Sequence, residues 1–344
     1  MSTSGPPPAR TRASLITLID EPLPATAGVD DDGLDRRDGR VYDYDDDTLL
    51  AIEVALTSGR PLLLRGDPGC GKSSLAAYVA RNLGWRYYEH VVTAATRAED
   101  LLWRYDAVRR LSDATRGKAD LGDAEYVDPG PLWWVFDQRS ATTRGTGEAL
   151  ERGPVQPNAA INEARRHQDR AVLLIDELDK ADPDVPNGLL VPLGSARFRV
   201  AETGVEVAQP PRPPGAATDP LSRLLVMITT NEERELPPAF LRRCVVHRLE
   251  HPNAERLVMI ARRHLAGPDG NLDSGLASLC EAVAERVSEL RSTAKERGAR
   301  PPSTAEFLDA VRACRSMGIT VGAGAWSTIE RVTLSKDDRL RYVR

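Results

Sequence analysis

Residues 66–73, GDPGCGKS, combine glycines, a lysine and a hydroxyl at the spacing of a phosphate-binding loop. Glycines let the backbone curl so that successive N–H groups converge on phosphate oxygens, and the following helix adds its positive N-terminal end. We expect Lys72 to reach the β- and γ-phosphates of a nucleotide and the Ser73 hydroxyl to bind Mg²⁺. A glycine-rich turn can also be purely structural, but the Lys-Ser pair and the flanking elements favour phosphate binding. The predicted nucleotide-binding residues are Asp67, Pro68, Gly69, Cys70, Gly71, Lys72, Ser73 and Ser74, together with Tyr42.

Two acidic residues follow a second apolar run of the chain. Asp176 is predicted to hold the Mg²⁺ shell through water, and Glu177 to polarise an attacking water as a general base. An isolated Asp-Glu pair is usually a solvated helix cap, but its position after a strand, downstream of a phosphate loop, favours the catalytic interpretation. We interpret Asp179 and Lys180 as surface charges at the start of a helix.

Asn231 follows a third apolar run. Its amide could orient the attacking water against the γ-phosphate. A turn-forming asparagine would have the same sequence context. We favour the first interpretation because the run before Asn231 is predicted to be the third strand of one sheet.

The three apolar runs, residues 61–64, 171–175 and 224–228, must position these side chains. Each run is continuous rather than alternating, which is typical of parallel strands buried on both faces. Each ends in a polar cluster, at the edge where open α/β sheets bind their ligands. Helices are predicted over 46–58 and 74–83, and the alternation around Gly204 predicts a β-hairpin.

The chain of 344 residues is long enough for two domains. A Pro-, Gly- and Asp-rich leader (1–39), expected to be disordered, precedes an α/β core (40–251) with an insert around 90–137 and the hairpin around 197–208. A helical domain (252–335) with helices over 254–265, 276–296 and 304–317 follows, and then a tail (336–344).

Composition excludes several classes of protein. The net charge of −5 gives no global basic field for nucleic acid. No apolar run approaches the roughly 20 residues that span a bilayer, and the N-terminus lacks the apolar segment of a secretory signal. The four cysteines have no metal-ligand spacing, so we expect reduced thiols and a cytoplasmic location.

Taken together, these segments resemble the AAA+ ATPases, and more narrowly the MoxR-like branch related to the dynein and McrB group. The resemblance covers about Val41 to Pro252 strongly and the helical remainder more loosely. The segments that carry it are the strand and loop at 60–69, Pro129-Gly130-Pro131-Leu132, the strand end at 174–181, the predicted hairpin, Thr230-Asn231 and residues 236–243.

This resemblance implies a P-loop NTPase (AAA+) fold, with a three-layer parallel-sheet core and a small all-helical lid domain. It also implies Mg²⁺-dependent hydrolysis of ATP held between subunits of a ring, usually a hexamer. On that reading Arg243, which matches the arginine of the family's LDRF motif, contacts a neighbour's nucleotide; Arg242 is the alternative, and both could be surface charges. The lid arginine of the family is not matched after Ser303-Thr304, and Arg300 is a candidate substitute.

The function implied by the resemblance is ATP-driven remodelling or assembly of a partner protein, often one with a von Willebrand factor A-type domain. One alternative is a switch whose ATP state controls assembly without remodelling. Another is a nucleic-acid motor of the McrB type, which the acidic composition disfavours. In the insert, Trp133, Trp134 and Phe136 could grip a client, although core packing is the preferred interpretation.

Overall fold

The computed structural model describes residues 39, 42–117, 122–150, 152–159, 162, 167–211, 222–265 and 272–336. Its main sheet has five strands in the order β2 (Trp85–Val91), β5 (His167–Asp176), β8 (Leu224–Thr230), β1 (Leu62–Arg65) and β9 (Val245–Arg248). The pairs β2–β5, β5–β8 and β8–β1 are parallel. The three predicted strands are therefore present and adjacent, and their carboxyl ends meet at one edge.

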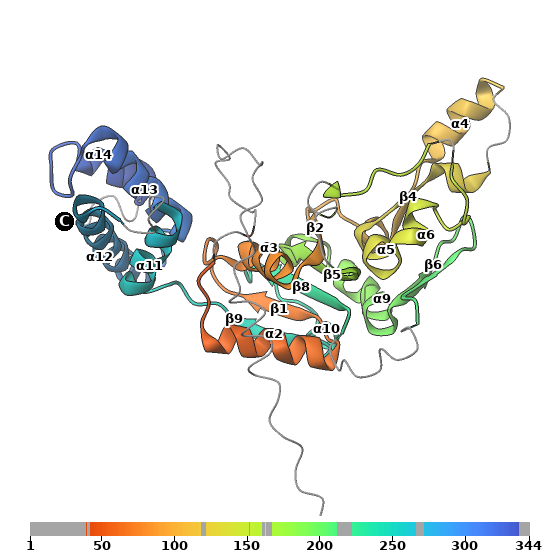
Figure 1. The fold of residues 1–344 in the computed structure, drawn as a ribbon, viewed down its shortest axis with the longest axis horizontal. Helices are drawn as coiled ribbons and strands as arrows, with labels where there is room; N and C mark the ends of the chain where they lie inside the picture. Colours follow the sequence, from red (N-terminus) through yellow and green to blue (C-terminus); the bar gives the residue numbers. More distant parts are fainter. Residues whose placement is uncertain are drawn as a thin grey trace, which may run out of the picture. The chain divides into compact units, whose positions relative to one another are not determined.

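Two helices frame the first strand (Figure 1). Helix α2 (Asp46–Ser58) ends just before β1 and packs against β1 and β8. Its acidic first turn, Asp46 and Asp47, suits the positive end of the helix. Helix α3 (Lys72–Leu83) follows the phosphate loop. Both helices match the prediction, except that α3 begins two residues earlier.

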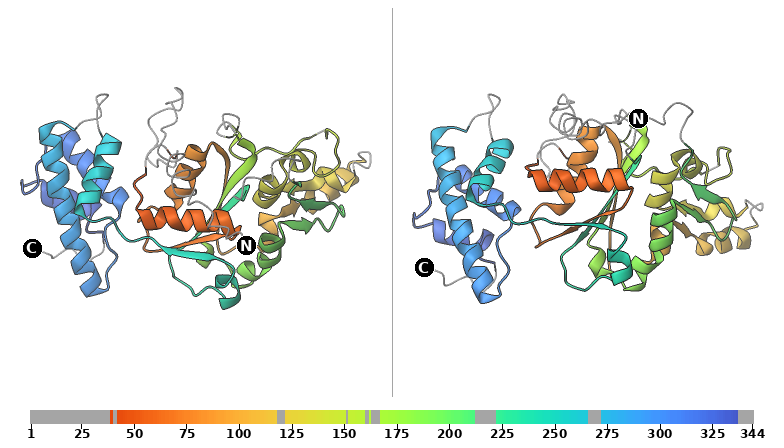
Figure 2. Two further views of the ribbon diagram at one scale, coloured as in Figure 1. Left: turned by 60° about the horizontal axis from the view of Figure 1, so that its bottom comes forward. Right: turned by 90° about the horizontal axis from the view of Figure 1, so that it is seen from below.

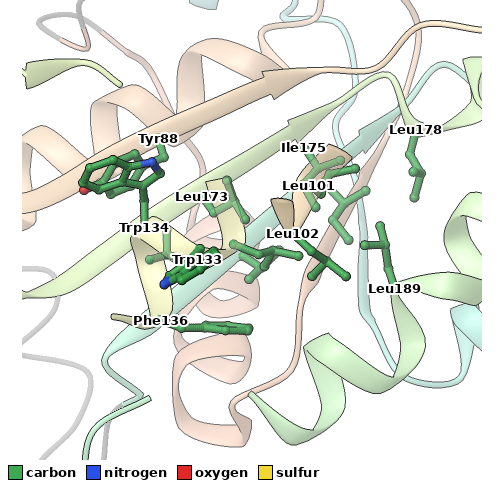
Figure 3. Packing of buried hydrophobic residues seen from close by; sticks show 14 of the residues in the cluster. Tyr88, Leu101, Leu102, Trp133, Trp134, Phe136, Leu173, Ile175, Leu178 and Leu189 are labelled. Carbon is green, nitrogen blue, oxygen red and sulfur yellow. The ribbon is translucent and has the colours of Figure 1, made fainter. Parts of the chain in front are cut away.

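The insert after β2 forms a small layer of its own. It contains η1 (Ala98–Leu101), β3 (Trp103–Tyr105), α4 (Ala107–Thr115), η2 (Asp123–Tyr126), β4 (Val127–Pro129), α5 (Pro131–Phe136) and α6 (Gln138–Thr142). Helix α5 packs against β2 and β5. Its Trp133, Trp134 and Phe136 are buried in one apolar cluster that also contains Leu173 of β5 (Figure 3). These aromatic side chains therefore serve core packing.

Short elements connect β5 to β8 and β9. They are η3 (Leu178–Lys180), α8 (Asp184–Gly188), α9 (Leu190–Ser195), the antiparallel pair β6 (Arg197–Arg199) and β7 (Glu206–Ala208), and α10 (Pro238–Leu241). The predicted hairpin is thus present. Phe198 of β6 stacks on Trp103 at a centroid distance of 5.8 Å and meets Trp133 edge-on, which attaches the hairpin to the insert.

Asn162 closes part of the open side of β2. Its Oδ1 accepts the backbone N–H of Tyr87 at 2.7 Å, and its Nδ2 donates to the carbonyl of the same residue at 3.1 Å. One side-chain amide thus satisfies both backbone groups of a residue on the edge strand.

The chain divides into two compact units. Of the described residues, the first contains those within 46–65 and 73–247; the second combines those within 42–45, 66–72 and 248–336. The second unit is built on α11 (Ala254–Leu265), α12 (Ser274–Arg297), α13 (Thr304–Met317) and α14 (Trp326–Thr333), which pack side by side in both views of Figure 2. Their apolar faces share one core around Val287, Phe307 and Trp326.

The expected domain limits remain predictions. The leader at 1–39 lies outside the described residues except for Gly39, and the tail at 336–344 lies outside them except for Lys336. Among the helices that the structure describes, none has the length and apolar character needed to cross a bilayer.

Candidate nucleotide-binding site

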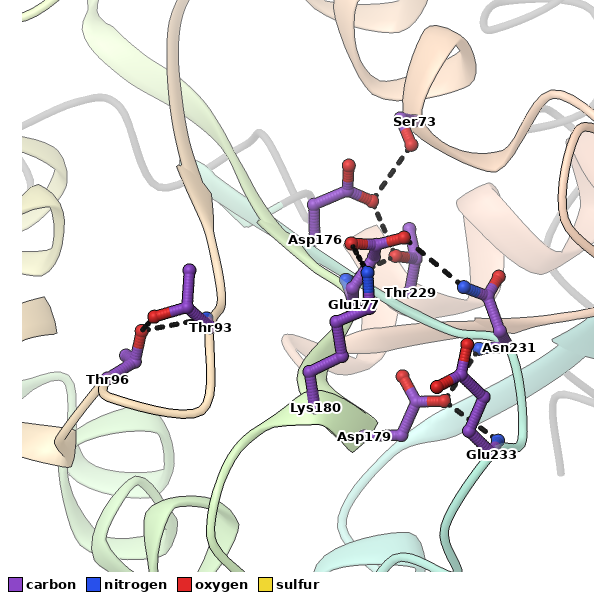
Figure 4. Close-up of polar contacts among 10 residues, drawn as sticks. All are labelled: Ser73, Thr93, Thr96, Asp176, Glu177, Asp179, Lys180, Thr229, Asn231 and Glu233. Carbon is purple, nitrogen blue, oxygen red and sulfur yellow. Dashed lines mark hydrogen bonds and ion pairs between the residues drawn. The ribbon is translucent and has the colours of Figure 1, made fainter.

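Asp176 is the last residue of β5, which pairs with β2 on one side and β8 on the other, and the residue is 4 % exposed. The Ser73 hydroxyl at the start of α3 donates to its Oδ1 at 2.8 Å, and the Thr229 hydroxyl on β8 donates to the same oxygen at 2.6 Å (Figure 4). Because β5 and β8 are parallel neighbours, their carboxyl ends bring these groups together. The fold thus joins the end of the phosphate loop to the first residue of the acidic pair.

Glu177 continues from Asp176 with an unusual backbone. Its φ of 60° and ψ of 47° are left-handed. Its backbone N–H donates to Thr229 Oγ1 at 2.8 Å. Its carboxylate oxygens have separate partners: Asn231 Nδ2 donates to Oε1 at 3.3 Å, and Lys180 Nζ donates to Oε2 at 2.6 Å (Figure 4). The predicted base and the predicted water-orienting amide are therefore in contact. We call Ser73, Asp176, Glu177, Thr229 and Asn231 the strand-end cluster.

The interpretation of Asp179 as a surface charge is wrong. The residue is 2 % exposed, and Oδ2 accepts the backbone N–H groups of Asn231 at 3.1 Å and Glu233 at 2.9 Å (Figure 4). Asp179 therefore fixes the loop that carries Asn231. Lys180 is half-exposed, and its hydrogen bond with Glu177 raises the pKa of Lys180, so the side chain is cationic at neutral pH.

The phosphate loop of the second unit is tightly curled. Gly69 and Gly71 have φ values of +80° and +102°, which residues with a Cβ adopt only with strain. Lys72 is 6 % exposed, and its Nζ donates to the carbonyls of Gly66 at 2.6 Å and Asp67 at 2.9 Å. The lysine therefore lies within the curl of the loop. Asp67, Pro68 and Gly69 are exposed, Cys70 is buried, and Ser73 and Ser74 are half-buried on the first turn of α3.

Two side chains of the second unit pack against this loop. A Cβ on Gly71 would lie 3.2 Å from the ring of Tyr42, and one on Gly69 would lie 2.2 Å from Cβ of Ser303. The backbone N–H of Thr304 also donates to the carbonyl of Gly69 at 3.2 Å. The start of α13 therefore abuts the loop, and burial raises the pKa of Tyr42, which keeps its phenol neutral.

His251 also lies beside the loop, with Nε2 3.6 Å from Asp67 Oδ2. Burial lowers the pKa of His251 from 6.5 to about 4, and Arg291 adds to this effect. The imidazole is consequently neutral at pH 7, and its contact with Asp67 is not an ion pair at that pH.

The three predicted arginines are exposed. Arg242 and Arg243 follow α10 and are exposed; Arg243 Nη1 donates to the carbonyl of Ala239 at 3.0 Å. Arg300 is paired with Glu306 at 3.0 Å, on the first turn of α13. None of the three is among the residues of the strand-end cluster, and a contact of Arg243 or Arg242 with a neighbouring subunit remains a prediction.

The residues present fit a magnesium ion. Mg²⁺ prefers oxygen ligands and is held by one or two carboxylates together with waters. Ser73 and Asp176 supply a hydroxyl and a carboxylate within 2.8 Å of each other. Two hard oxygen donors at the end of a phosphate loop are the kind of ligand that this ion prefers.

Sequence reasoning missed Thr229, Asp179 and Ser303 as organisers of the site. Thr229 had a usable signal, because a hydroxyl near the end of the strand beside Asp176 can donate to it. The sequence signal for Ser303 was weaker: Glu306 follows it by three residues, and the two form a capping box. That box predicts where α13 begins but not that its start meets Gly69.

The chain matches the model of a known protein family. The model of the AAA domain, dynein-related subfamily, matches residues 61–244. No curated protein matches the chain.

Among solved structures, the chain is similar to domain III of the replication initiation protein DnaA of Thermotoga maritima. The identity is 15 %, 87 % of this chain and 96 % of that chain are covered, and the TM-score is 0.42. It is also similar to the Thermotoga maritima RuvB Holliday junction branch migration motor, with 17 % identity, coverage of 82 % and 66 % respectively, and a TM-score of 0.39. This chain thus spans slightly less than two thirds of the RuvB chain. With TM-scores below 0.5, neither similarity bears on what this chain does.

The family match covers more than half of the chain and includes the phosphate loop and every residue of the strand-end cluster. With its parallel five-stranded sheet and flanking helices, the chain therefore belongs to the AAA domain family, in the dynein-related subfamily of these nucleotide-binding ATPases.

Proposed function

We propose that this chain is a Mg²⁺-dependent ATPase of the MoxR-like branch that couples hydrolysis to remodelling or assembly of a partner protein. The observation that carries the proposal is the hydrogen bond of 2.8 Å between Ser73 and Asp176, with Glu177 and Asn231 in contact beside it. Residues from the three separate sequence motifs thus form one cluster of the kind that phosphate hydrolysis requires.

Each residue has a role in this proposal. The N–H groups of the phosphate loop and Lys72 bind the phosphate oxygens. Ser73 would bind Mg²⁺ directly and Asp176 would hold its shell through water, and the bound ion would supply positive charge beside the phosphates. Glu177 accepts a proton from the attacking water, and Asn231, through its contact with Glu177, helps to orient that water.

The remaining features of the proposal rest on resemblance. Exposed Arg243, or Arg242 in its place, would neutralise charge on a neighbour's nucleotide in a homo-oligomeric ring, usually a hexamer. A von Willebrand factor A-type protein is the kind of partner that the MoxR-like resemblance suggests. A net charge of −5 disfavours nucleic acid as the substrate.

Four variants test the chemistry. We expect Lys72→Ala to lose ATP binding, and Glu177→Gln to bind ATP normally while turnover falls by about 10²–10⁴-fold, the usual range for loss of a general base. Arg243→Ala should assemble normally but lose about 10³-fold in turnover, whereas Arg242→Ala should keep most of its activity. Steady-state phosphate release, nucleotide affinity and sedimentation measure these three properties. Normal turnover by Glu177→Gln would remove the assigned base.

The remodelling step needs its own test. Glu177→Gln protein loaded with ATP should retain a partner that is released with ADP, and the wild type should release it during hydrolysis. A switch without remodelling would assemble with ATP but leave the partner's conformation unchanged, which hydrogen exchange on that partner would reveal. Steeply salt-dependent DNA binding would instead indicate a nucleic-acid motor.

A further inference from the structure

We propose that Lys180 is a positioning residue for Glu177: its ammonium group holds the carboxylate where it can act on water. This inference rests on the proposed ATPase function. The observation behind it is the contact of 2.6 Å between Lys180 Nζ and Glu177 Oε2, the shorter of the two side-chain contacts to that carboxylate in Figure 4.

Glu177 needs such a restraint because only its backbone is fixed firmly. The left-handed conformation of a residue with a side chain costs about 1–2 kcal/mol. It is maintained by the N–H donated to Thr229 and by the carbonyl, which accepts the N–H of Lys180 at 3.0 Å. Among the described residues, the carboxylate accepts one other hydrogen bond, that of 3.3 Å from Asn231. Two donors on two different oxygens define the plane of the carboxylate, and one donor does not.

Lys180 is placed for this role by the turn that it ends. The single turn η3 begins directly after Glu177, so Lys180 lies three residues on and its side chain reaches back over the turn. The neighbouring Asp179 holds the loop of Asn231 from the same turn. One short helix therefore positions both donors to Glu177, Lys180 directly and Asn231 through its backbone.

The ion pair between Lys180 and Glu177 contributes little to the stability of the fold, so its role can be tested by substitution. The side chains are 41 % and 29 % exposed, and ion pairs this exposed contribute very little to folding. Removing the Lys180 side chain should therefore leave the protein folded. Arg312 is a control, because its ion pair with Asp309 has the same three-residue spacing and its side chain is 37 % exposed against 41 % for Lys180, but it lies on α13.

The expected loss follows from the freedom that Glu177 gains. Two sp³ torsions with three staggered states each give roughly nine rotamers. If most of these rotamers become accessible, the population of the rotamer that acts on water falls by up to about ten-fold. We therefore expect Lys180→Ala to lower kcat for ATP by about ten-fold, to change the KM and the affinity for ATP by less than about two-fold, and Lys180→Arg to recover most of kcat. Arg312→Ala should leave kcat unchanged.

A double variant separates positioning from a structural role. In the Glu177→Gln background, Lys180→Ala should have no further effect on the residual turnover, because Lys180 acts through the carboxylate that has been removed. An equal loss in both backgrounds, an unchanged kcat, or a kcat that rises when Lys180 is replaced would each overturn the inference.

A second readout does not require hydrolysis. In crystals of Lys180→Ala, the Glu177 side chain should occupy several rotamers, whereas in Lys180→Arg it should occupy one. A single unchanged Glu177 rotamer in Lys180→Ala would refute the inference even if the wild type hydrolyses ATP. A wild type without turnover would refute the proposed function, and the rotamer result would still decide the role of Lys180.

Discussion

Replacing Asp179 with alanine should release the loop that carries Asn231. The buried carboxylate accepts two backbone N–H groups, from Asn231 at 3.1 Å and Glu233 at 2.9 Å. A hydrogen bond to a charged acceptor contributes about 1.5–3 kcal/mol, so the two together could reach about 3–6 kcal/mol. Glu233 is exposed, and water can replace the carboxylate there. We therefore expect local stability to fall by about 2–3 kcal/mol.

Amide hydrogen exchange measures this quantity directly. A change of about 2–3 kcal/mol corresponds to roughly 30–150-fold faster exchange of the Asn231 and Glu233 amides, at 1.4 kcal/mol for each factor of ten. Asp182→Ala is the control: this exposed aspartate accepts one N–H, from Asp184 at 3.0 Å, and lies on the same connection. If exchange of the two loop amides in Asp179→Ala is no faster than in Asp182→Ala, the carboxylate does not hold the loop.

Two further predictions concern the second unit. The folded-state pKa of His251 is about 4 against an ordinary value of 6.5, so the folded state binds its proton less readily than the unfolded state does. The stabilisation of the folded state by neutral His251 is therefore fully present above pH 6.5 and is lost as the pH falls towards 4, by about 3 kcal/mol at 1.36 kcal/mol per pKa unit. In urea unfolding across this pH range, the free energy of unfolding should fall more steeply for the wild type than for His251→Gln. The same pH dependence in both proteins would contradict the lowered pKa of His251. Gly69→Ala adds a Cβ 2.2 Å from Ser303, whereas Gly322→Ala, at φ +85°, meets nothing within 4 Å. Both should suffer left-handed strain, but Gly69→Ala should be destabilised by about 1–3 kcal/mol more in urea unfolding, and equal losses would show that the loop and α13 separate freely.

The central strands could be predicted because each is a continuous run of apolar residues, which indicates burial on both faces. Residues 171–175 and 224–228 are apolar on both faces, and a parallel sheet brings their ends together without further information. The contact between Ser73 and Asp176 follows from that arrangement. Ser73 and Asp176 could therefore be identified as neighbours from the sequence, whereas Thr229, which also donates to Asp176, was missed.

Strand β2 was missed because it contains a buried arginine, Arg86, one of whose hydrogen-bond partners is remote in the sequence. Arg86 lies within the strand and is buried, with its guanidinium donating to the Tyr88 hydroxyl and to the carbonyl of Trp134, each at 2.9 Å. A run containing arginine does not resemble a buried strand unless those partners are known, and one of them lies 48 residues away. Asp179 was misinterpreted for the same reason, since its two donors come from the loop after β8.

The amide of Asn162 has a consequence for how the molecule meets copies of itself. An edge strand with free backbone groups is a template on which another chain can add a strand, a route to aggregation. At Tyr87 the side chain of Asn162 already occupies the position that an incoming strand would take. A single polar side chain thus makes part of this sheet edge unavailable for intermolecular pairing.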